Sequence, residues 1–292
     1  MHVRIIKVIA CLLAFAAIAL MGVLVFGYFS HDRLSATSAD GAETSTNDAT
    51  SKKQEQQIQT LTSLVPSLTT TIQAADVSTS VSIIDIDTGR QYDAGLDVDF
   101  RAASTTKVLT ALAFIHQVEQ GKATLNTQIN GASAQVMLQR LLQYSDNTAW
   151  SAFNDFLGRE WLESYAHTIG LSSFAVADNT ITAHDEARLM AQLVNYQDIS
   201  QGHAELLMSF MQNTDNEQLI PAALPTTARV YHKYGYLEGE LHDAAIIAYK
   251  GHTFVVVIYT NNQRATIDDS ATRTQLIHAL TTDVIEAYDA LD

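Results

Sequence analysis

The sequence predicts an α+β fold, in which one antiparallel five-stranded sheet is flanked by terminal helices and carries an inserted all-helical lobe. Strand-like runs occur near the beginning of the predicted domain, at 80–97, and again near its end, at 228–261. The stretch between them, from 104 to about 213, has the spacing of successive helices and no convincing strand. Strands at both ends with helices between them imply a single sheet and a separate helical lobe.

The N-terminal segment predicts a membrane-spanning helix that precedes this fold. Residues 8–29 are an uninterrupted apolar run, long enough to cross a hydrocarbon core of about 30 Å. Arg4 and Lys7 stand before it, so the positive-inside rule places the N-terminus in the cytoplasm and the rest of the chain outside. We expect residues 1–29 to be a retained anchor in the cell membrane, with secretion after signal cleavage as the alternative.

A stalk and a helix are expected next. Residues 30–53 are rich in Ser, Thr, Asp and Ala and have almost no apolar residue, which predicts a flexible stalk. The domain then covers 54–292. Its first segment, 54–75, is predicted to be a helix that Pro66 kinks or splits, because proline cannot donate the helical hydrogen bond.

The strands follow from alternation and from turn residues. Residues 81–86 alternate and then break at 87–90, which predicts the first hairpin. Gly251 supplies a tight turn between the last two strands. The C-terminal strands are predicted at 228–237, 241–250 and 253–261, and a closing amphipathic helix at 273–291.

Charge and cysteine content exclude several classes of protein. The chain has 32 acidic and 17 basic residues, for a net charge of −15, which argues against binding to nucleic acid or to anionic lipid. Cys11 is the only cysteine, so no intramolecular disulfide is possible, and it lies too early in the apolar run for a lipoprotein cleavage box. The ten histidines show no zinc-ligand spacing, so we expect no metal and no cofactor.

The most informative motif is Ser104-Thr105-Thr106-Lys107, placed where a helix is expected to begin. A serine in the first helical turn has its hydroxyl near unpaired backbone N–H groups and the positive end of the helix dipole. Lys107 lies on the same face one turn later, so its amine can reach the serine oxygen. This arrangement suits a serine nucleophile with a lysine as its base.

Two further motifs follow in order along the chain. Ser145-Asp146-Asn147 comes after an amphipathic helical run, and Lys233-Tyr234-Gly235 opens a strand-like run near the C-terminus. In order and spacing, the three motifs resemble those of the class A β-lactamase and penicillin-binding DD-peptidase family of serine hydrolases. The resemblance covers the chain from about Ser78 to the C-terminus, and it implies a β-lactamase/transpeptidase-like fold.

The resemblance implies the catalytic residues. Ser104 attacks a carbonyl to form an acyl-enzyme, and Lys107 takes the serine proton. Ser145 relays a proton between Lys107 and the leaving nitrogen. The backbone N–H groups of Ser104 and Tyr236 form the oxyanion hole.

The resemblance also implies the substrate-binding residues. Asn147 donates to the substrate's amide carbonyl, and Lys233 supplies a second positive charge beside Tyr234 and Gly235 of the same motif. The family has Thr or Ser where this chain has Tyr234, and that small hydroxyl helps to hold the substrate's carboxylate. Tyr234 either offers its phenol from a different distance or packs, so carboxylate recognition is not implied here. His232 likewise either touches the site or packs.

A second departure concerns the long loop whose glutamate activates the deacylating water in class A β-lactamases. The loop belongs between Gly170 and Asp178, but only seven residues separate them and none is acidic. Asp178 is the nearest carboxylate, and its position suggests a structural bracing role. Without the glutamate, hydrolysis of a β-lactam acyl-enzyme lacks its base and is expected to be slow.

These inferences predict a serine acyl-enzyme hydrolase. Its substrate is expected to be a β-lactam, deacylated slowly, or a peptidoglycan stem peptide of the D-Ala-D-Ala type. The alternative is a non-catalytic, membrane-tethered module that binds penicillin or cell-wall fragments.

Overall fold

The computed structural model describes residues 43–75, 77–262 and 269–291 of the chain. The predicted membrane anchor, residues 1–29, lies outside these ranges. Within them, no helix is both long and apolar enough to cross a membrane. Gln54–Asp292 form one compact unit, and this unit contains all three motifs.

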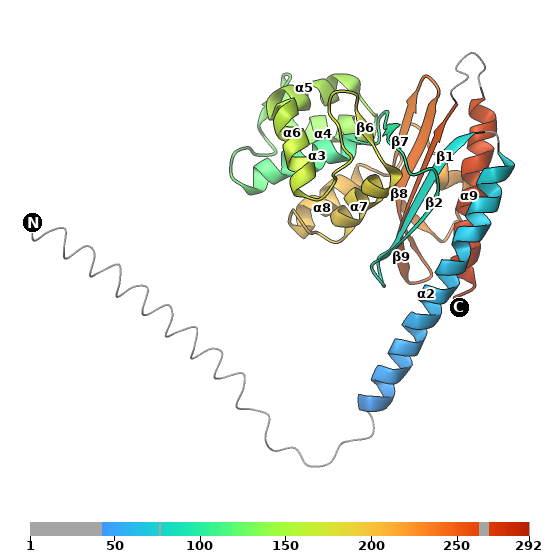
Figure 1. The fold of residues 1–292 in the computed structure, drawn as a ribbon. Helices are drawn as coiled ribbons and strands as arrows, with labels where there is room; N and C mark the ends of the chain where they lie inside the picture. The colour runs from blue at the N-terminus through green and yellow to red at the C-terminus, as the bar shows by residue number, and fades with distance from the viewer. Residues whose placement is uncertain (1–42, 76, 263–268, 292) are drawn as a thin grey trace, which may run out of the picture. The chain divides into compact units, whose positions relative to one another are not determined.

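Figure 1 shows how the helices and the long strands of the described chain are arranged. The helices are α2 (Glu43–Ala74), α3 (Lys107–Glu119), α4 (Ala134–Leu142), α5 (Asn147–Leu157), α6 (Arg159–Thr168), α7 (Ala183–Val194), α8 (Gln201–Ser209), the 3-10 helix η1 (Ile220–Ala223) and α9 (Ser270–Asp289). The long strands are β1 (Ser78–Asp85), β2 (Arg90–Gly95), β7 (Arg229–Leu237), β8 (Glu240–Tyr249) and β9 (His252–Asn261). The strands of two residues are β3 (Phe100–Arg101), β4 (Gln128–Ile129), β5 (Ala132–Ser133) and β6 (Thr180–Ile181).

The five long strands form one antiparallel sheet in the order β2-β1-β9-β8-β7, which confirms the predicted sheet. The first and last parts of the domain meet in its centre, where Ser82 of β1 pairs with Val257 of β9. Lys250 and Gly251 have φ of +49° and +83°, as a two-residue type I′ hairpin turn requires. The predicted tight turn at Gly251 is therefore confirmed.

Both faces of the sheet are covered, and alternate residues of each strand enter different cores. Ala244 and Ile246 of β8 join the core beneath the helical lobe, while Ala245 and Ile247 join the core beneath α2 and α9. Figure 1 shows α9 along one face of the sheet and the lobe of helices α3 to α8 on the other. Burying each large aliphatic side chain stabilises the fold by about 1.5–3 kcal/mol, so a continuous apolar contact holds the lobe to the sheet.

Helix α2 differs from its prediction in two ways. It runs without a break from Glu43 to Ala74, so the expected split at Pro66 is wrong. Pro66 has no N–H to donate to the Thr62 carbonyl. Both residues are exposed, so water can donate to that carbonyl instead. Residues 43–53, predicted to belong to a flexible stalk, are also helical, because extending an existing helix costs far less than nucleating one.

The helical lobe contains short strands that its sequence did not predict. Phe100 and Arg101 of β3 pair with Ile181 and Thr180 of β6, and β4 pairs with β5. The expectation of a lobe without strands is therefore wrong, because two residues are too few to show an alternating pattern. The β3–β6 pair matters for the site, since it joins the segment before Ser104 to the segment after the short loop.

Candidate active site

Two lysine side chains converge on the hydroxyl of Ser145. Lys107 Nζ at the start of α3 lies 3.2 Å from Ser145 Oγ, and Lys233 Nζ from β7 lies 2.9 Å from the same atom. Ser145 occupies the turn between α4 and α5 with φ of +51°, in the left-handed region. Residues from all three predicted motifs therefore meet between the lobe and the sheet.

Lys107 is buried, with 1% of its surface exposed, and three oxygen atoms accept from its amine. These are the Ser145 carbonyl oxygen at 2.5 Å, Ser145 Oγ, and Asn147 Oδ1 at 2.8 Å. Burial lowers the pKa of Lys107 to about 8, against the opposing charge of Asp146. An amine with this pKa is neutral in a minor fraction of molecules at neutral pH, and this fraction can act as a base.

Lys233 is fully buried in the edge strand β7. Its Nζ donates to Ser145 Oγ and, at 2.8 Å, to the carbonyl oxygen of Tyr234, and it lies 4.2 Å from the centroid of the Tyr234 ring. Burial and the nearby charge of Lys107 lower the pKa of Lys233 well below its ordinary value. Tyr234 therefore contacts the lysine through its ring, and it also packs against the core beneath α2 and α9.

Ser104 lies in the turn just before α3 and not in the first helical turn, where its sequence position predicts it. The turn is closed by bonds from Thr105 N to Ala102 O and from Lys107 N to Ser104 O. Lys107 is consequently the first helical residue. Among the described residues no hydrogen bond joins its amine to Ser104, because other oxygen atoms hold it.

Strand β7 passes directly against the Ser104 turn. A Cβ atom on Gly235 would lie 2.9 Å from Ala102 O and 3.1 Å from Ser104 N, closer than side chains normally approach. Glycine is therefore required at 235, and the strand backbone reaches the serine without a side chain between them.

The backbone N–H of Tyr236 points toward the outer edge of β7. His232 N donates outward to Met211 O at 2.8 Å, away from β8. Every second residue of an antiparallel strand directs its N–H to the same side, so Tyr236 also points away from β8. With Gly235 against Ser104 N, the two predicted oxyanion-hole donors come from adjoining backbone segments.

The turn that holds the serine is braced by Asn179, which no sequence pattern indicated. Asn179 Nδ2 donates to Ala103 O at 2.8 Å, and Asn179 Oδ1 accepts from Thr106 Oγ1 at 2.7 Å. Its carbonyl oxygen accepts from Ala102 N at 2.8 Å. Both Asn179 and Ala103 have φ of +52°, so the two sides of this contact are left-handed. Asn179 thus braces the turn from the position next to Asp178, the residue for which the sequence suggested such a role.

Asp146 holds the Ser145 turn in place. Its carboxylate caps α5, accepting from Thr148 N at 2.7 Å and from Ala149 N at 3.2 Å. It also pairs with Arg140 of α4. Capping satisfies N–H groups that no helical carbonyl can reach. Asp146 thereby fixes the residues on either side of it.

His232 and His242 belong to separate structural networks. His232 is fully buried and bonds Asp243 at 2.9 Å and Glu217 at 3.2 Å. Burial lowers its pKa, but these carboxylates outweigh burial and raise the pKa of His232 to about 9. His242 Nε2 donates to Arg101 O at 2.9 Å, since its Nδ1 accepts from a backbone N–H. The adjacent pair His242-Asp243 thus points into two different networks.

Residues that follow it hold the short loop of residues 171–177 in place. Ala175 and Thr180 form a backbone bridge, and Ser173 Oγ donates to Asp185 Oδ2 at 2.7 Å. Positions 171–177 hold no acidic residue, so the loop brings no carboxylate of its own toward the site.

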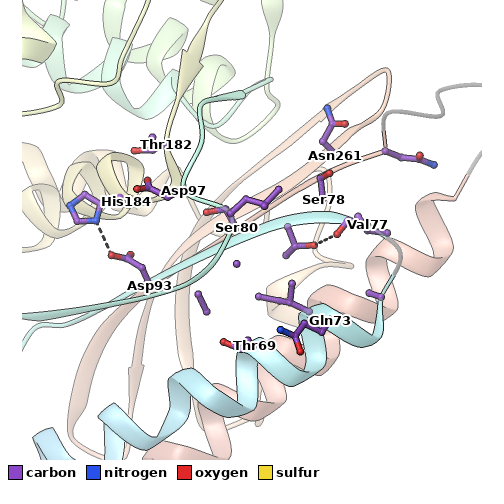
Figure 2. A pocket seen from close by; sticks show the side chains of 17 residues that line it. Thr69, Gln73, Val77, Ser78, Ser80, Asp93, Asp97, Thr182, His184 and Asn261 are labelled. Atoms are coloured by element: carbon purple, nitrogen blue, oxygen red, sulfur yellow. Dashed lines mark hydrogen bonds and ion pairs between the residues drawn. The ribbon is translucent and has the colours of Figure 1, made fainter.

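A hollow of about 1010 Å³ lies apart from the lysine cluster, where α2 ends and β1 begins (Figure 2). None of the residues of the three motifs lines it. His184 Nδ1 pairs with Asp93 Oδ2 at 2.9 Å within this hollow. Its other polar lining residues include Thr69, Gln73, Ser78, Asp97 and Asn261. In the described part of the chain, no group of three His, Cys, Asp or Glu side chains is placed to hold a metal.

Glu186 of α7 is a fully buried carboxyl group that no sequence pattern singled out. Neither of its side-chain oxygens has a hydrogen-bond partner among the described residues. It lies near Tyr259, whose hydroxyl bonds Thr105 Oγ1 at 2.6 Å. Burial raises the pKa of Glu186 to about 8, although the nearby Tyr259 and the charge of Lys233 lower it.

Comparisons with known proteins identify the family of this chain. Residues 59–288 match the model of the beta-lactamase enzyme family. Beta-lactamase OXY-2 of Klebsiella oxytoca is 28% identical over 198 residues, which are 56% of this chain and 68% of that protein. This match and the family match confirm the resemblance found in the sequence.

Two solved structures show the likeness of the fold. The structure of PBP-A matches with a TM-score of 0.72 and 23% identity, covering 79% of this chain and 97% of that chain. An ancestral (GNCA) class A beta-lactamase matches with a TM-score of 0.70 and 24% identity, covering 77% of this chain and 99% of that chain.

The buried Glu186 predicts a specific dependence of stability on pH. A carboxyl whose pKa rises from 4.5 to about 8 on folding is protonated in both states at low pH, so it destabilises progressively as pH rises through this interval. Ionisation of Glu186 should lower the free energy of unfolding of the wild-type protein between pH 5 and pH 8 by up to about 1.4 kcal/mol per pH unit. Glu186→Gln should not show this part of the decrease, because glutamine does not titrate. Urea denaturation at both pH values measures this, with the exposed Glu55→Gln as the control. Equal losses in the wild type and Glu186→Gln would contradict it.

Proposed function

Because this chain belongs to the beta-lactamase enzyme family, we propose that it is a serine acyl-enzyme hydrolase with Ser104 as its nucleophile. Its substrate is a β-lactam or a peptide of the D-Ala-D-Ala type. The observation that carries this proposal is the meeting of Lys107 and Lys233 at Ser145 Oγ, beside the Ser104 turn. Two amines buried against one hydroxyl group contribute little to the stability of the fold. The same arrangement suits proton transfer between an amine and the hydroxyl.

Acylation begins with removal of the serine proton. Neutral Lys107 accepts the proton of Ser104 Oγ as that oxygen attacks the carbonyl carbon. The lowered pKa of Lys107, about 8, leaves a useful fraction of the amine neutral at physiological pH. Negative charge then develops on the carbonyl oxygen, and the N–H groups of Ser104 and Tyr236 stabilise it.

Collapse of this intermediate breaks the carbon–nitrogen bond. Ser145 Oγ gives its proton to the leaving nitrogen and receives one from Lys107, which lies 3.2 Å away. Lys233 holds Ser145 in position from the other side. Asn147 donates from its Nδ2 to the amide carbonyl of the substrate, while its Oδ1 accepts from Lys107. The acyl group remains on Ser104 as an ester.

Hydrolysis of that ester requires a base for the attacking water. Lys107 can serve both steps for a peptide, because the leaving amine departs and opens the site to water. The ring-opened leaving group of a β-lactam stays attached and blocks the same approach. The loop at positions 171–177 brings no carboxylate to replace Lys107, so the β-lactam acyl-enzyme is long-lived.

A second candidate function uses the same long-lived adduct. A membrane-tethered module that binds penicillin or cell-wall fragments needs acylation or binding but no turnover. The missing loop carboxylate and the Tyr234 ring over Lys233 favour this alternative. Retention of Ser104, Lys107 and Ser145 favours the hydrolase.

The nucleophile assignment is tested by intact-mass spectrometry after incubation with penicillin. We expect one covalent adduct on the wild-type protein and none on Ser104→Ala. The exposed Ser63→Ala, on α2, is the matched control and should form the adduct at the wild-type rate. An adduct on Ser104→Ala would show that another residue is the nucleophile.

The slow-deacylation step is tested with a chromogenic cephalosporin followed by stopped flow. We expect a stoichiometric burst and then a steady state lowered by about 10²–10⁴, the usual cost of a missing general base. Loss of the adduct should take minutes or longer. Rapid sustained turnover would mean that a carboxylate from elsewhere enters the site, while a complete absence of turnover with both cephalosporin and peptide would favour the binding module.

We further propose that residues 8–29 anchor the chain in the cell membrane with the hydrolase domain outside the cytoplasm. The uninterrupted apolar run and the basic residues Arg4 and Lys7 support this. After alkaline carbonate extraction of cells that express the full chain, the protein should remain in the membrane pellet, and protease added to spheroplasts should digest the domain. Release of a shortened chain into the medium would instead indicate signal cleavage.

A further inference from the structure

Glu186 of α7 is a buried carboxyl group close to the residues that hold the nucleophile. We infer that Glu186 is a positioning residue for acylation by Ser104. Its protonated carboxyl begins a chain of hydrogen bonds that runs through Tyr259 and Thr105 to the serine turn, and its ionisation breaks that chain. The inference rests on the proposed acylation of Ser104, and it names a residue that controls how that reaction depends on pH.

The chain ends at the carbonyl oxygen of Ala102, which closes the serine turn. Thr105 Oγ1 donates to Ala102 O at 3.0 Å, and Thr105 N donates to the same oxygen at 3.2 Å. A Cβ atom on Gly235 would lie 2.9 Å from Ala102 O, so strand β7 also packs against this carbonyl group. A change in the bonds of Ala102 O therefore acts on the backbone that holds Ser104.

The direction of the chain follows from a count of hydroxyl protons. A hydroxyl group has one proton to donate and two lone pairs that accept. Thr105 uses its proton on Ala102 O, so the tyrosine donates in the 2.6 Å bond between Tyr259 Oη and Thr105 Oγ1. The oxygen of Tyr259 is then left with lone pairs alone, and its next partner has to be a donor.

Glu186 can supply this donor. Its side chain is fully buried, and neither of its oxygens has a hydrogen-bond partner among the residues that the structure describes. The Tyr259 hydroxyl lies close enough to change the pKa of this carboxyl. A protonated carboxyl has one O–H to donate, whereas a carboxylate only accepts. Glu186 and Tyr259 therefore meet each other's requirement when Glu186 is protonated.

Ionisation of Glu186 reverses the chain. A carboxylate attracts the hydroxyl proton of Tyr259 more strongly than a neutral oxygen does. Thr105 then turns its own proton toward the tyrosine, and Ala102 O keeps only its bond from Thr105 N. The hydroxyl groups only rotate, and the proton that Glu186 loses goes to solvent. Acylation is slower when the nucleophile is held less firmly in its attacking position.

The groups around Glu186 set the pH range of this change. Burial raises the pKa of Glu186 to about 8, although Tyr259 of β9 and the charge of Lys233 of β7 lower it. Burial also raises the pKa of Tyr259 well above its ordinary value, and the charge of Glu240 of β8 acts in the same direction. His242 of β8 stacks on Tyr259, but both of its ring nitrogens bond backbone groups. The chain is therefore intact at pH 6 and mostly broken at pH 9.

Other charged groups on the elements packed against α7 have partners of their own. Lys107 of α3 is held at the α4–α5 turn by three oxygen atoms. On α7 itself, Asp185 accepts from the Ser173 hydroxyl, and His184 pairs with Asp93 of β2. Strand β1 turns toward the lobe side chains that do not titrate, namely Ser80, Ser82 and Ile84. The buried carboxyl is therefore the group whose protonation the chain follows.

The test measures the rate of penicillin adduct formation by intact mass at pH 6 and pH 9. The rate of Glu186→Gln is divided by that of the wild type at the same pH, which removes the pH dependence that both proteins share. Glutamine cannot ionise, and its amide N–H replaces the carboxyl O–H as the donor. The ratio should be near one at pH 6 and about two to ten at pH 9, the equivalent of one neutral hydrogen bond.

A second background separates the hydrogen-bond chain from the charge of Glu186. Thr105→Val removes the hydroxyl between Tyr259 and Ala102 and leaves the Glu186 carboxyl free to ionise. Adding Glu186→Gln to Thr105→Val should therefore no longer raise the rate at pH 9. The exposed Glu160→Gln, on α6 of the same lobe, is the matched control and should keep a ratio of one at both pH values.

Each outcome separates the two proposals. A ratio of Glu186→Gln to wild type that is no higher at pH 9 than at pH 6 would overturn the role of Glu186 and leave the acylation of Ser104 standing. A rise at pH 9 that persists in the Thr105→Val background would mean that the charge acts directly on the lysines, and it would overturn the chain. The absence of any adduct on the wild-type protein would overturn both proposals.

Discussion

The site depends on the placing of two buried ammonium groups against one hydroxyl oxygen, Ser145 Oγ. Like charges in a poorly solvated region repel each other, and they persist only where a proton leaves or a carboxylate compensates. Both occur here, because burial lowers the pKa of each lysine and several acidic side chains lie nearby. Since Lys107 belongs to the lobe and Lys233 to the sheet, the function requires a fixed distance between these two parts.

Two kinds of contact set that distance. The apolar core beneath the lobe is shared by α3, α7 and the strands β8 and β9, so the lobe cannot slide over the sheet without exposing buried side chains. At the site itself, Gly235 lets the β7 backbone touch the Ser104 turn, and Asn179 ties that turn to the segment after the short loop. The reacting groups are thus positioned by backbone contacts on two sides.

The sheet, its closing helix and the three motifs could be predicted from the sequence, because alternation, turn glycines and motif order are local patterns. The importance of Asn179 could not, since it arises from a contact with Ala103 across 76 positions of the chain. Glu186 was missed because its spacing in α7 looks like that of any polar helix residue, and only the packing of the lobe buries it. The sequence predicted Ser104 in the first turn of the helix, but it lies in the turn before the helix. Consecutive three-residue turns and a helix have similar residue spacing, so the sequence does not distinguish them.

Three residues around the nucleophile, Ala103, Ser145 and Asn179, share φ values between +51° and +52°. For a residue with a side chain this conformation costs about 1 kcal/mol, which the rest of the fold must offset. Substitution by glycine at any of the three positions would relieve that cost. It would also make the backbone more flexible at a place where the reaction needs it rigid. Side chains branched at Cβ are disfavoured there most strongly. The stability of the domain and the rigidity of its most reactive corner therefore make opposite demands on these three positions.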